Sequence, residues 1–97
     1  MIWQYINTGE NTGSFNMDFD LSLVKETVPD TIILRLYRWN PYCISLGANQ
    51  SYAGINEGKA AADGIEIVKR PTGGRAILHS EELTYSVVMP SGAITFS

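Results

Sequence analysis

Lys69-Arg70-Pro71-Thr72-Gly73-Gly74-Arg75-Ala76-Ile77-Leu78-His79 is the stretch that organises this chain, and apolar runs flank it at residues 65–68 and 83–88. Its paired glycines allow positive φ and close approach of a ligand to the backbone. Successive N–H groups in such a turn can form an anion-binding nest, and arginines at both ends add donors suited to phosphate or carboxylate. An ordinary Gly-Gly hairpin with two solvated arginines has the same residue types, so both interpretations stay open at this point.

Length and composition indicate one small globular domain. The chain has 97 residues, of which 44% are hydrophobic and 18% charged, and disordered chains are less apolar. A net charge of -3 without a basic patch gives no reason to expect a nucleic-acid partner. Cys43 is the only cysteine, so the sequence predicts neither a disulfide framework nor a cysteine metal site. The chain shows no signal peptide and no apolar run of about 20 residues, so we expect no membrane segment and a cytoplasmic location.

The N-terminal part predicts a strand followed by a helix. Residues 2–6 are aromatic and β-branched, residues 7–13 form a turn cluster, and Ser14 is the expected N-cap. Apolar residues alternate with polar ones from position 15 to 23, which is a strand pattern, but the intervening Asn and Asp are poor strand formers. A helical stripe contains Met17, Leu21, Val24 and Val28, with Phe15 and Phe19 on the other side. We therefore predict a helix over residues 15–28, buried on two faces and ended by Pro29.

The remaining segments predict strands with one short helix. Residues 31–39 and 42–46 are expected to pair as a hairpin around the turn Asn40-Pro41. Asn56 can cap a helix over residues 57–63, and Gly64 fits its C-terminal cap. Further strands are predicted at residues 66–69, 76–79 and 83–89, with residues 90–92 ending the last one.

The stretch from Lys69 to His79, followed by residues 82–87, resembles the signature of lipoate-protein ligases and their octanoyltransferase relatives. Three further pieces resemble this family in the same order along essentially the whole chain. They are Trp3 to Asn7, Phe15-Asn16-Met17 with Asp20, and Trp39-Asn40-Pro41 leading to Ile44-Ser45-Leu46-Gly47 and Gln50. The resemblance favours the functional interpretation of the glycine-rich turn.

The resemblance implies an α+β fold, with a mixed, largely antiparallel sheet flanked by helices. Residues 1–97 would be the N-terminal half of a catalytic domain of the biotin and lipoate ligase type. The ligases activate lipoate or octanoate with ATP and Mg²⁺ and transfer it to a lysine of a lipoyl-domain protein. Such acceptors are the glycine-cleavage H protein and a 2-oxoacid dehydrogenase subunit. The transferases instead take octanoate from acyl carrier protein through a cysteine thioester. We expect part of a ligase, with a transferase fragment as the alternative.

The resemblance also assigns roles to the turn. Arg70 matches an arginine that contacts nucleotide, and the two glycines keep the backbone clear of the acyl carboxyl end. The full set of expected nucleotide- and acyl-binding residues is Arg70, Gly73, Gly74, Arg75, Ala76, Ile77, Leu78 and His79. His79 could orient a ligand or shuttle a proton, and a structural hydrogen bond near the site is the simpler role. Lys69 replaces the arginine that is usual at its position, so no role is transferred to it.

Other candidates have simpler structural explanations. Cys43 could be a nucleophile with His79 as base, but its place in a predicted strand indicates a buried thiol. Tyr37 and Trp39 could line an acyl pocket, although aromatic strand residues usually belong to the core. Asp18 and Asp20 on a helix are expected to form hydrogen bonds or to be solvated, so we predict no metal ligand.

The family's essential lysine and the transferases' cysteine lie C-terminal to the glycine-rich turn, and none of Lys25, Lys59 and Lys69 has that context. We therefore expect no catalytic residue in this chain. It would be a truncated or cleaved fragment, one half of a split enzyme, or a decayed relative that serves as a non-catalytic binding module. A complementary C-terminal chain or self-association would cover its unpaired strand edges.

Overall fold

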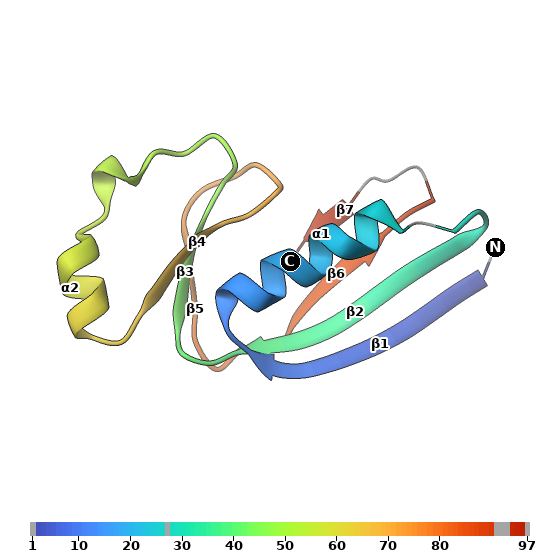
Figure 1. Cartoon of the computed structure of the whole chain (residues 1–97), viewed down its shortest axis with the longest axis horizontal. Helices are drawn as coiled ribbons and strands as arrows, with labels where there is room; N and C mark the ends of the chain where they lie inside the picture. Colours follow the sequence, from blue (N-terminus) through green and yellow to red (C-terminus); the bar gives the residue numbers. More distant parts are fainter. Residues whose placement is uncertain (1, 27, 91–93, 97) are drawn as a thin grey trace.

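Two β-sheets joined by one long helix form the structure, a computed structural model that describes residues 2–26, 28–90 and 94–96 (Figure 1). In chain order its elements are β1 (Ile2–Asn11), α1 (Gly13–Lys25), β2 (Thr31–Trp39), β3 (Cys43–Leu46), a 3-10 turn (Tyr52–Gly54), α2 (Glu57–Ala62), β4 (Glu66–Lys69), β5 (Ile77–His79), β6 (Thr84–Val88) and β7 (Ile94–Phe96). The predicted α+β class is confirmed. Residues 90–92 were predicted to end the last strand, and residues 91–92 of that segment lie outside the described residues; β7 was not predicted.

The larger sheet has the order β1-β2-β6-β7 and the smaller one the order β4-β3-β5. In each sheet one pair is parallel, β1 with β2 and β3 with β4, and the other pairs are antiparallel. The predicted hairpin of residues 31–39 with 42–46 is wrong, because both edges of β2 are occupied by β1 and β6. The corner at Asn40-Pro41, a cis peptide, instead leads the chain from one sheet into the other.

The first strand is longer than predicted. It continues to Asn11 through most of the predicted turn cluster, with a register shift between Asn7 and Gly9. Gly9 has φ 72°, so the bulge uses the conformational freedom of this glycine without ending the strand. The predicted cap at Ser14 is also wrong, because Thr12 is the N-cap and its Oγ1 accepts a hydrogen bond from Phe15 N at 3.1 Å.

Helix α1 confirms the helical interpretation but is shorter and less buried than predicted. It ends at Lys25 with Glu26 as its C-cap, and Thr27 lies outside the described residues. Phe15 is 44% exposed and Leu21 39% exposed, whereas Met17 and Leu23 are buried. Burial on two faces is therefore wrong, since the sheets lie against one side of this helix only.

A carboxylate from the smaller sheet caps α1. Glu66 on β4 accepts hydrogen bonds from Gly13 N at 2.6 Å, Ser14 N at 3.1 Å and Ser14 Oγ at 2.6 Å. Negative charge at a helix N-terminus interacts favourably with unpaired N–H groups and with the helix dipole. Ser14 thus contributes to the start of the helix through a partner 52 residues away, which local sequence could not reveal.

The interior beneath α1 contains a paired arginine. Arg35 on β2 donates to Asp20 Oδ1 at 2.9 Å, and both side chains are fully buried. Tyr37 donates to the other oxygen of Asp20 at 3.1 Å, and Ser86 donates to Oδ1 at 2.8 Å. Burial, and then the charge of Asp20, raise the pKa of Tyr37. The prediction of a hydrogen-bonding role for Asp20 is confirmed, and Asp18 is exposed.

The short helix agrees with its sequence signals. Asn56 is the N-cap of α2, and its Oδ1 accepts from Lys59 N at 2.9 Å. Gly64 follows the helix with φ 72°, the conformation expected at its C-terminal cap. Within the described residues no helix is long and apolar enough to cross a membrane. The cytoplasmic location stays a prediction.

Candidate functional site

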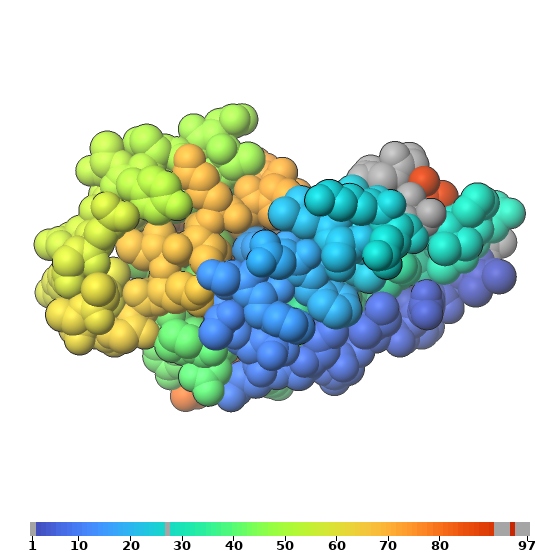
Figure 2. All heavy atoms as spheres, in the orientation of Figure 1, coloured from blue at the N-terminus to red at the C-terminus, as the bar shows by residue number. Residues whose placement is uncertain are grey.

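The glycine-rich turn connects β4 to β5 and has a buried base and an exposed rim. Arg70 and His79 at its two ends are buried, at 3% and 1% exposure. The six predicted site residues between them are all exposed, namely Gly73, Gly74, Arg75, Ala76, Ile77 and Leu78. In Figure 2 the orange atoms of this part of the chain reach the surface between the green segment and the blue helix α1. The structure thus places Arg70 to Ala76 in the loop and Ile77 to His79 on β5, and residues 73–78 of this segment face solvent.

Arg70 points into the protein and binds the loop from inside. Its Nη1 donates to the carbonyl oxygen of Ser45 at 2.8 Å and to Ser45 Oγ at 2.7 Å. Its Nη2 donates to the carbonyl oxygens of Gly73 at 3.1 Å and Arg75 at 2.8 Å. Burial lowers the pKa of Arg70. These four hydrogen bonds attach the turn to β3 on both sides of Gly74.

The inward carbonyl groups determine where the neighbouring amides point. In a trans peptide the C=O and the following N–H point in opposite directions within one plane. Because the carbonyls of Gly73 and Arg75 turn toward Arg70, the N–H groups of Gly74 and Ala76 turn away from it. Gly74 has φ 105°, a conformation that favours glycine. The amides of Gly74 and Ala76, with the exposed Arg75 between them in the sequence, are therefore candidate donors for an oxyanion.

Gly47 is a second glycine on which this turn depends, and it was not among the predicted site residues. A Cβ at Gly47 would collide with the carbonyl oxygen of Gly74. Two backbone hydrogen bonds hold the segments together, from Ala48 N to Thr72 O at 2.9 Å and from Arg70 N to Leu46 O at 2.8 Å. The sequence signal was present in Gly47 itself, but its partner lies 27 positions further along the chain.

His79 lies behind the turn as a structural hydrogen-bonding residue. Its Nε2 lies 2.7 Å from Ser45 Oγ, and its Nδ1 lies 3.2 Å from Glu82 Oε2. Burial lowers the pKa of His79, the charge of Arg70 lowers it further, and Glu82 opposes this shift. The order Ser45–His79–Glu82 resembles a nucleophilic triad, but Ser45 is fully buried and already bonded to Arg70. Ser45 therefore helps to hold Arg70 and the turn in place, and it is not placed for nucleophilic attack.

Trp39 connects this buried region to a surface cleft. Its ring stacks on His79 with centroids 4.0 Å apart and an interplanar angle of 10°, and its Nε1 donates to Thr84 Oγ1 at 2.8 Å. At 2% exposure Trp39 belongs to the core, as predicted, and so does the fully buried Tyr37.

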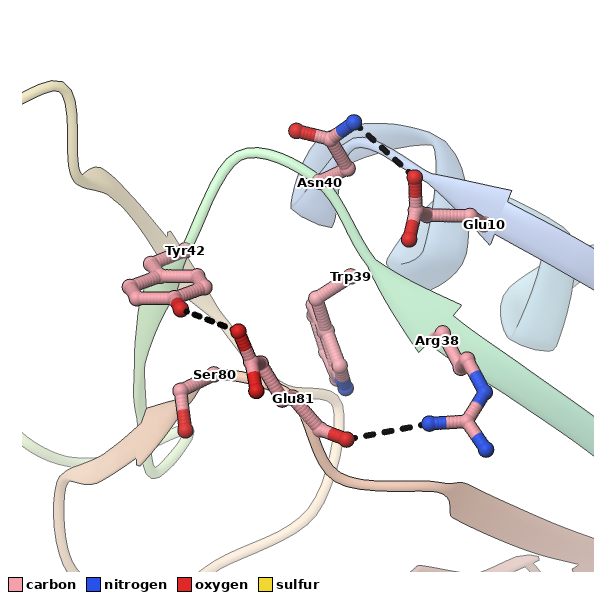
Figure 3. A pocket seen from close by; sticks show the side chains of 7 residues that line it. All are labelled: Glu10, Arg38, Trp39, Asn40, Tyr42, Ser80 and Glu81. Atoms are coloured by element: carbon pink, nitrogen blue, oxygen red, sulfur yellow. Dashed lines mark hydrogen bonds between the residues drawn. The ribbon is translucent and has the colours of Figure 1, made fainter.

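The cleft beside Trp39 has a volume of about 350 Å³ (Figure 3). It is lined by Glu10, Arg38, Trp39, Asn40, Tyr42, Ser80 and Glu81. Figure 3 shows its polar groups paired with one another: Asn40 donates to Glu10 at 2.9 Å, and Tyr42 donates to Glu81 at 3.1 Å. None of the predicted site residues lines this cleft, so it is separate from the glycine-rich rim.

Cys43 is not suited to nucleophilic attack. It is fully buried on β3, and burial followed by the nearby Glu66 carboxylate raises its pKa to about 12. A Cβ at Gly13 would lie 2.6 Å from Cys43 Sγ, so the helix start is in close contact with this side of the thiol. The prediction of a buried structural thiol is confirmed. Among the described residues, no group of three His, Cys, Asp or Glu side chains could hold a metal ion.

Replacing Cys43 by Ser is expected to leave acyl transfer at the wild-type rate in a completed catalytic domain, meaning residues 1–97 together with their C-terminal part. The free energy of unfolding should fall by about 1–3 kcal/mol because a hydroxyl is buried in place of a thiol. Urea unfolding and the transfer rate check both effects. An acyl thioester trapped on Cys43, with turnover lost in the folded Ser variant, would contradict this prediction.

Comparisons with known proteins agree with the sequence resemblance. The sequence profile of the lipoyl protein ligase A/B catalytic domain matches residues 12–97. The chain belongs to this family. Octanoyltransferase LipM of Lysinibacillus sphaericus is 40% identical over 90 residues, which are 90% of this chain and 33% of that protein. The chain therefore spans about a third of the length of this curated relative.

Solved structures of this family have the same fold. Protein Ta0514 of T. acidophilum, described as a lipoate protein ligase and solved with bound lipoic acid, has a TM-score of 0.73 and 25% identity. The match covers 90% of this chain and 37% of that one. Lipoate-protein ligase A bound with ATP also has a TM-score of 0.73 and 25% identity, with 90% of this chain and 36% of that one covered. The expected match to the N-terminal part of such a domain is confirmed.

Proposed function

We propose that this chain is the N-terminal part of an octanoyltransferase, which moves an octanoyl group from a carrier-protein thioester to a lysine of a lipoyl domain. The observation that carries this proposal is the rim of the glycine-rich turn. Arg70 holds the carbonyl groups of Gly73 and Arg75 at 3.1 and 2.8 Å, so that the amides of Gly74 and Ala76 turn away from Arg70. The 40% identity with octanoyltransferase LipM supports the choice of a transferase over a ligase.

The proposed reaction has two acyl-transfer steps. A thiolate attacks the thioester carbonyl, a tetrahedral oxyanion forms, and the carrier thiol leaves as the octanoyl group becomes bound to the enzyme. The lysine amine then attacks the new thioester, an amide forms, the amine proton is released and the enzyme thiol leaves. Preorganised N–H donors stabilise the oxyanion in each step. The attacking thiol comes from outside residues 1–97, because Cys43 is buried with a raised pKa.

The rim also offers an apolar surface for the acyl chain. Ile77 is 41% exposed and Leu78 is 56% exposed, and both follow the outward amide of Ala76 directly along the chain. Acyl sites combine apolar walls with a few polar groups that fix the carbonyl. In this arrangement Arg75 and the two amides bind the polar end, and one of Ile77 and Leu78, which lie on opposite faces of β5, contacts the start of the hydrocarbon.

An ATP-dependent lipoate ligase is the second candidate. Its support is the structural similarity to lipoate-protein ligase A bound with ATP. Backbone amides and an exposed arginine also suit phosphate oxygens, so the rim is compatible with either chemistry.

The acyl donor distinguishes the two candidates. The completed catalytic domain is incubated with a lipoyl domain and one of two acyl sources, which are octanoyl-carrier protein alone or octanoate with ATP and Mg²⁺. The mass of the lipoyl domain is then measured by mass spectrometry. We expect octanoylation from the carrier protein without ATP, and none from residues 1–97 alone, whose one cysteine, Cys43, is buried. Modification only with octanoate and ATP would establish the ligase instead. Modification by the bare chain would show that the reactive group lies within residues 1–97.

A further inference from the structure

A connected series of polar side chains runs from the glycine-rich turn through the interior of the protein and reaches the surface at Glu82. Arg70 binds Ser45, Ser45 lies 2.7 Å from His79, and His79 lies 3.2 Å from Glu82. We call these four residues the polar relay. Its first three members are buried, whereas the side chain of Glu82 is 38% exposed. Glu82 is thus the point at which the relay reaches solvent, and neither the turn nor the cleft includes it.

The chemistry of the partners sets the direction of each hydrogen bond. Arginine can only donate, so Ser45 Oγ accepts from Arg70, and its own hydrogen is then available to His79 Nε2 when that nitrogen carries no proton. In that arrangement the proton of the neutral imidazole is on Nδ1. Nδ1 lies 3.2 Å from Glu82 Oε2, a distance at which the carboxylate favours a proton on this nitrogen.

The Glu82 carboxylate is itself held in place. Thr84 Oγ1 donates to Glu82 Oε2 at 3.3 Å and accepts from Trp39 Nε1 at 2.8 Å. The Trp39 ring also stacks on His79, with centroids 4.0 Å apart. The imidazole is therefore fixed by its two nitrogens and by one face.

We propose that Glu82 is a positioning residue for the acyl site, acting through the tautomer of His79. With Nδ1 protonated, the Ser45 hydroxyl is free to accept from Arg70, and Arg70 keeps the carbonyls of Gly73 and Arg75 turned inward. If the proton moves to Nε2, Ser45 Oγ accepts from both His79 and Arg70 through its two lone pairs, but its own buried hydrogen loses its acceptor, so the hydroxyl has to reorient. Arg70 is then held less firmly, and the outward amides lose their fixed direction. This inference rests on the proposed function of the turn.

Three variants separate positioning from charge and from general stability. Glu82→Ala removes the carboxylate oxygens near Nδ1. Glu82→Gln removes the charge but keeps an acceptor oxygen on a side chain of the same length. Glu81→Ala is the matched control, because it removes the adjacent carboxylate, which accepts from the exposed Tyr42 and lies outside the relay. Thermal unfolding of each variant is recorded so that only folded protein is compared.

The readouts are kcat and KM for octanoyl transfer by the completed catalytic domain and the ¹⁵N shifts of the His79 ring, assigned by their loss in His79→Gln. In Glu82→Ala we expect the proton to leave Nδ1 and kcat to fall by up to about hundredfold, the effect of misplacing a reacting group by an ångström. KM should stay near the wild-type value. Glu82→Gln and Glu81→Ala should keep both the tautomer and kcat.

Three results would overturn the inference. One is a Glu82→Ala protein whose His79 still carries its proton on Nδ1. Another is a shifted tautomer with unchanged kcat, and the third is an equal loss of kcat in Glu82→Gln, which would make charge the cause. If the wild-type protein transfers no octanoyl group from any donor, the proposed function fails. The ring shifts then still test whether Glu82 sets the tautomer, and an unchanged proton on Nδ1 overturns the inference alone.

Discussion

Replacing Arg70 by Ala is expected to reduce acyl transfer by at least about hundredfold in the completed catalytic domain, because the donors of the turn lose their orientation. The side chain makes four hydrogen bonds that attach Gly73 and Arg75 to Ser45. Stability should also fall, by about 1–3 kcal/mol for each buried Ser45 acceptor that stays unsatisfied. Arg70→Lys should not restore transfer, since an ammonium group cannot span acceptors on both sides of the turn.

The measurements are the transfer rate and the free energy of unfolding in urea. Lys69→Ala is the matched control, because it removes the adjacent positive charge from an exposed side chain. Its transfer rate and stability should stay close to those of the wild type. Wild-type transfer by folded Arg70→Ala protein would show that the inner arginine does not organise the site.

Replacing Asp20 by Ala is expected to lower the free energy of unfolding by about 3–5 kcal/mol, because it leaves the charge of Arg35 buried without its partner. Both side chains are fully buried and lie 2.9 Å apart. Tyr37 and Ser86 lose an acceptor in the same change.

Asp18→Ala provides the control, since Asp18 is exposed on the same helix two positions away. Surface changes of this kind stay within about 0.5 kcal/mol. Urea unfolding of the completed catalytic domain compares the two variants. An Asp20→Ala protein as stable as the Asp18→Ala protein would show that breaking the buried Arg35–Asp20 pair costs little free energy of unfolding.

Elements with local signals were predictable from the sequence. The cap at Asn56, the glycine after α2 and the β-branched run of β4 depend on residues within one turn or strand. The wrong predictions involve partners that are distant in the chain. The hairpin of β2 and β3 fails because β2 pairs with β1 and β6, and the start of α1 depends on Glu66.

The candidate site shows the same division. Residue types alone left open whether the glycine-rich turn binds an anion or is an ordinary hairpin, and only the family resemblance favoured binding; the structure places those glycines on an exposed rim. The inward direction of Arg70 could not be predicted, because its acceptor Ser45 lies 25 positions away on β3. Gly47 was missed for the same reason, since only the fold brings it against the Gly74 carbonyl.

The central claim is that the rim of this turn binds the acyl carbonyl during transfer, and Gly74→Val tests it most directly. Gly74 has φ 105°, which valine adopts only with strain, and a Cβ there would lie 3.2 Å from Arg70 Nη2. The measurement is the rate of octanoyl transfer from carrier protein to a lipoyl domain, followed by the mass of the lipoyl domain, for wild-type and Gly74→Val forms of the completed catalytic domain. We expect a folded variant whose rate is lower by about a hundredfold to a thousandfold, the range for loss of an oxyanion donor. A folded Gly74→Val protein that transfers the octanoyl group at the wild-type rate would contradict it.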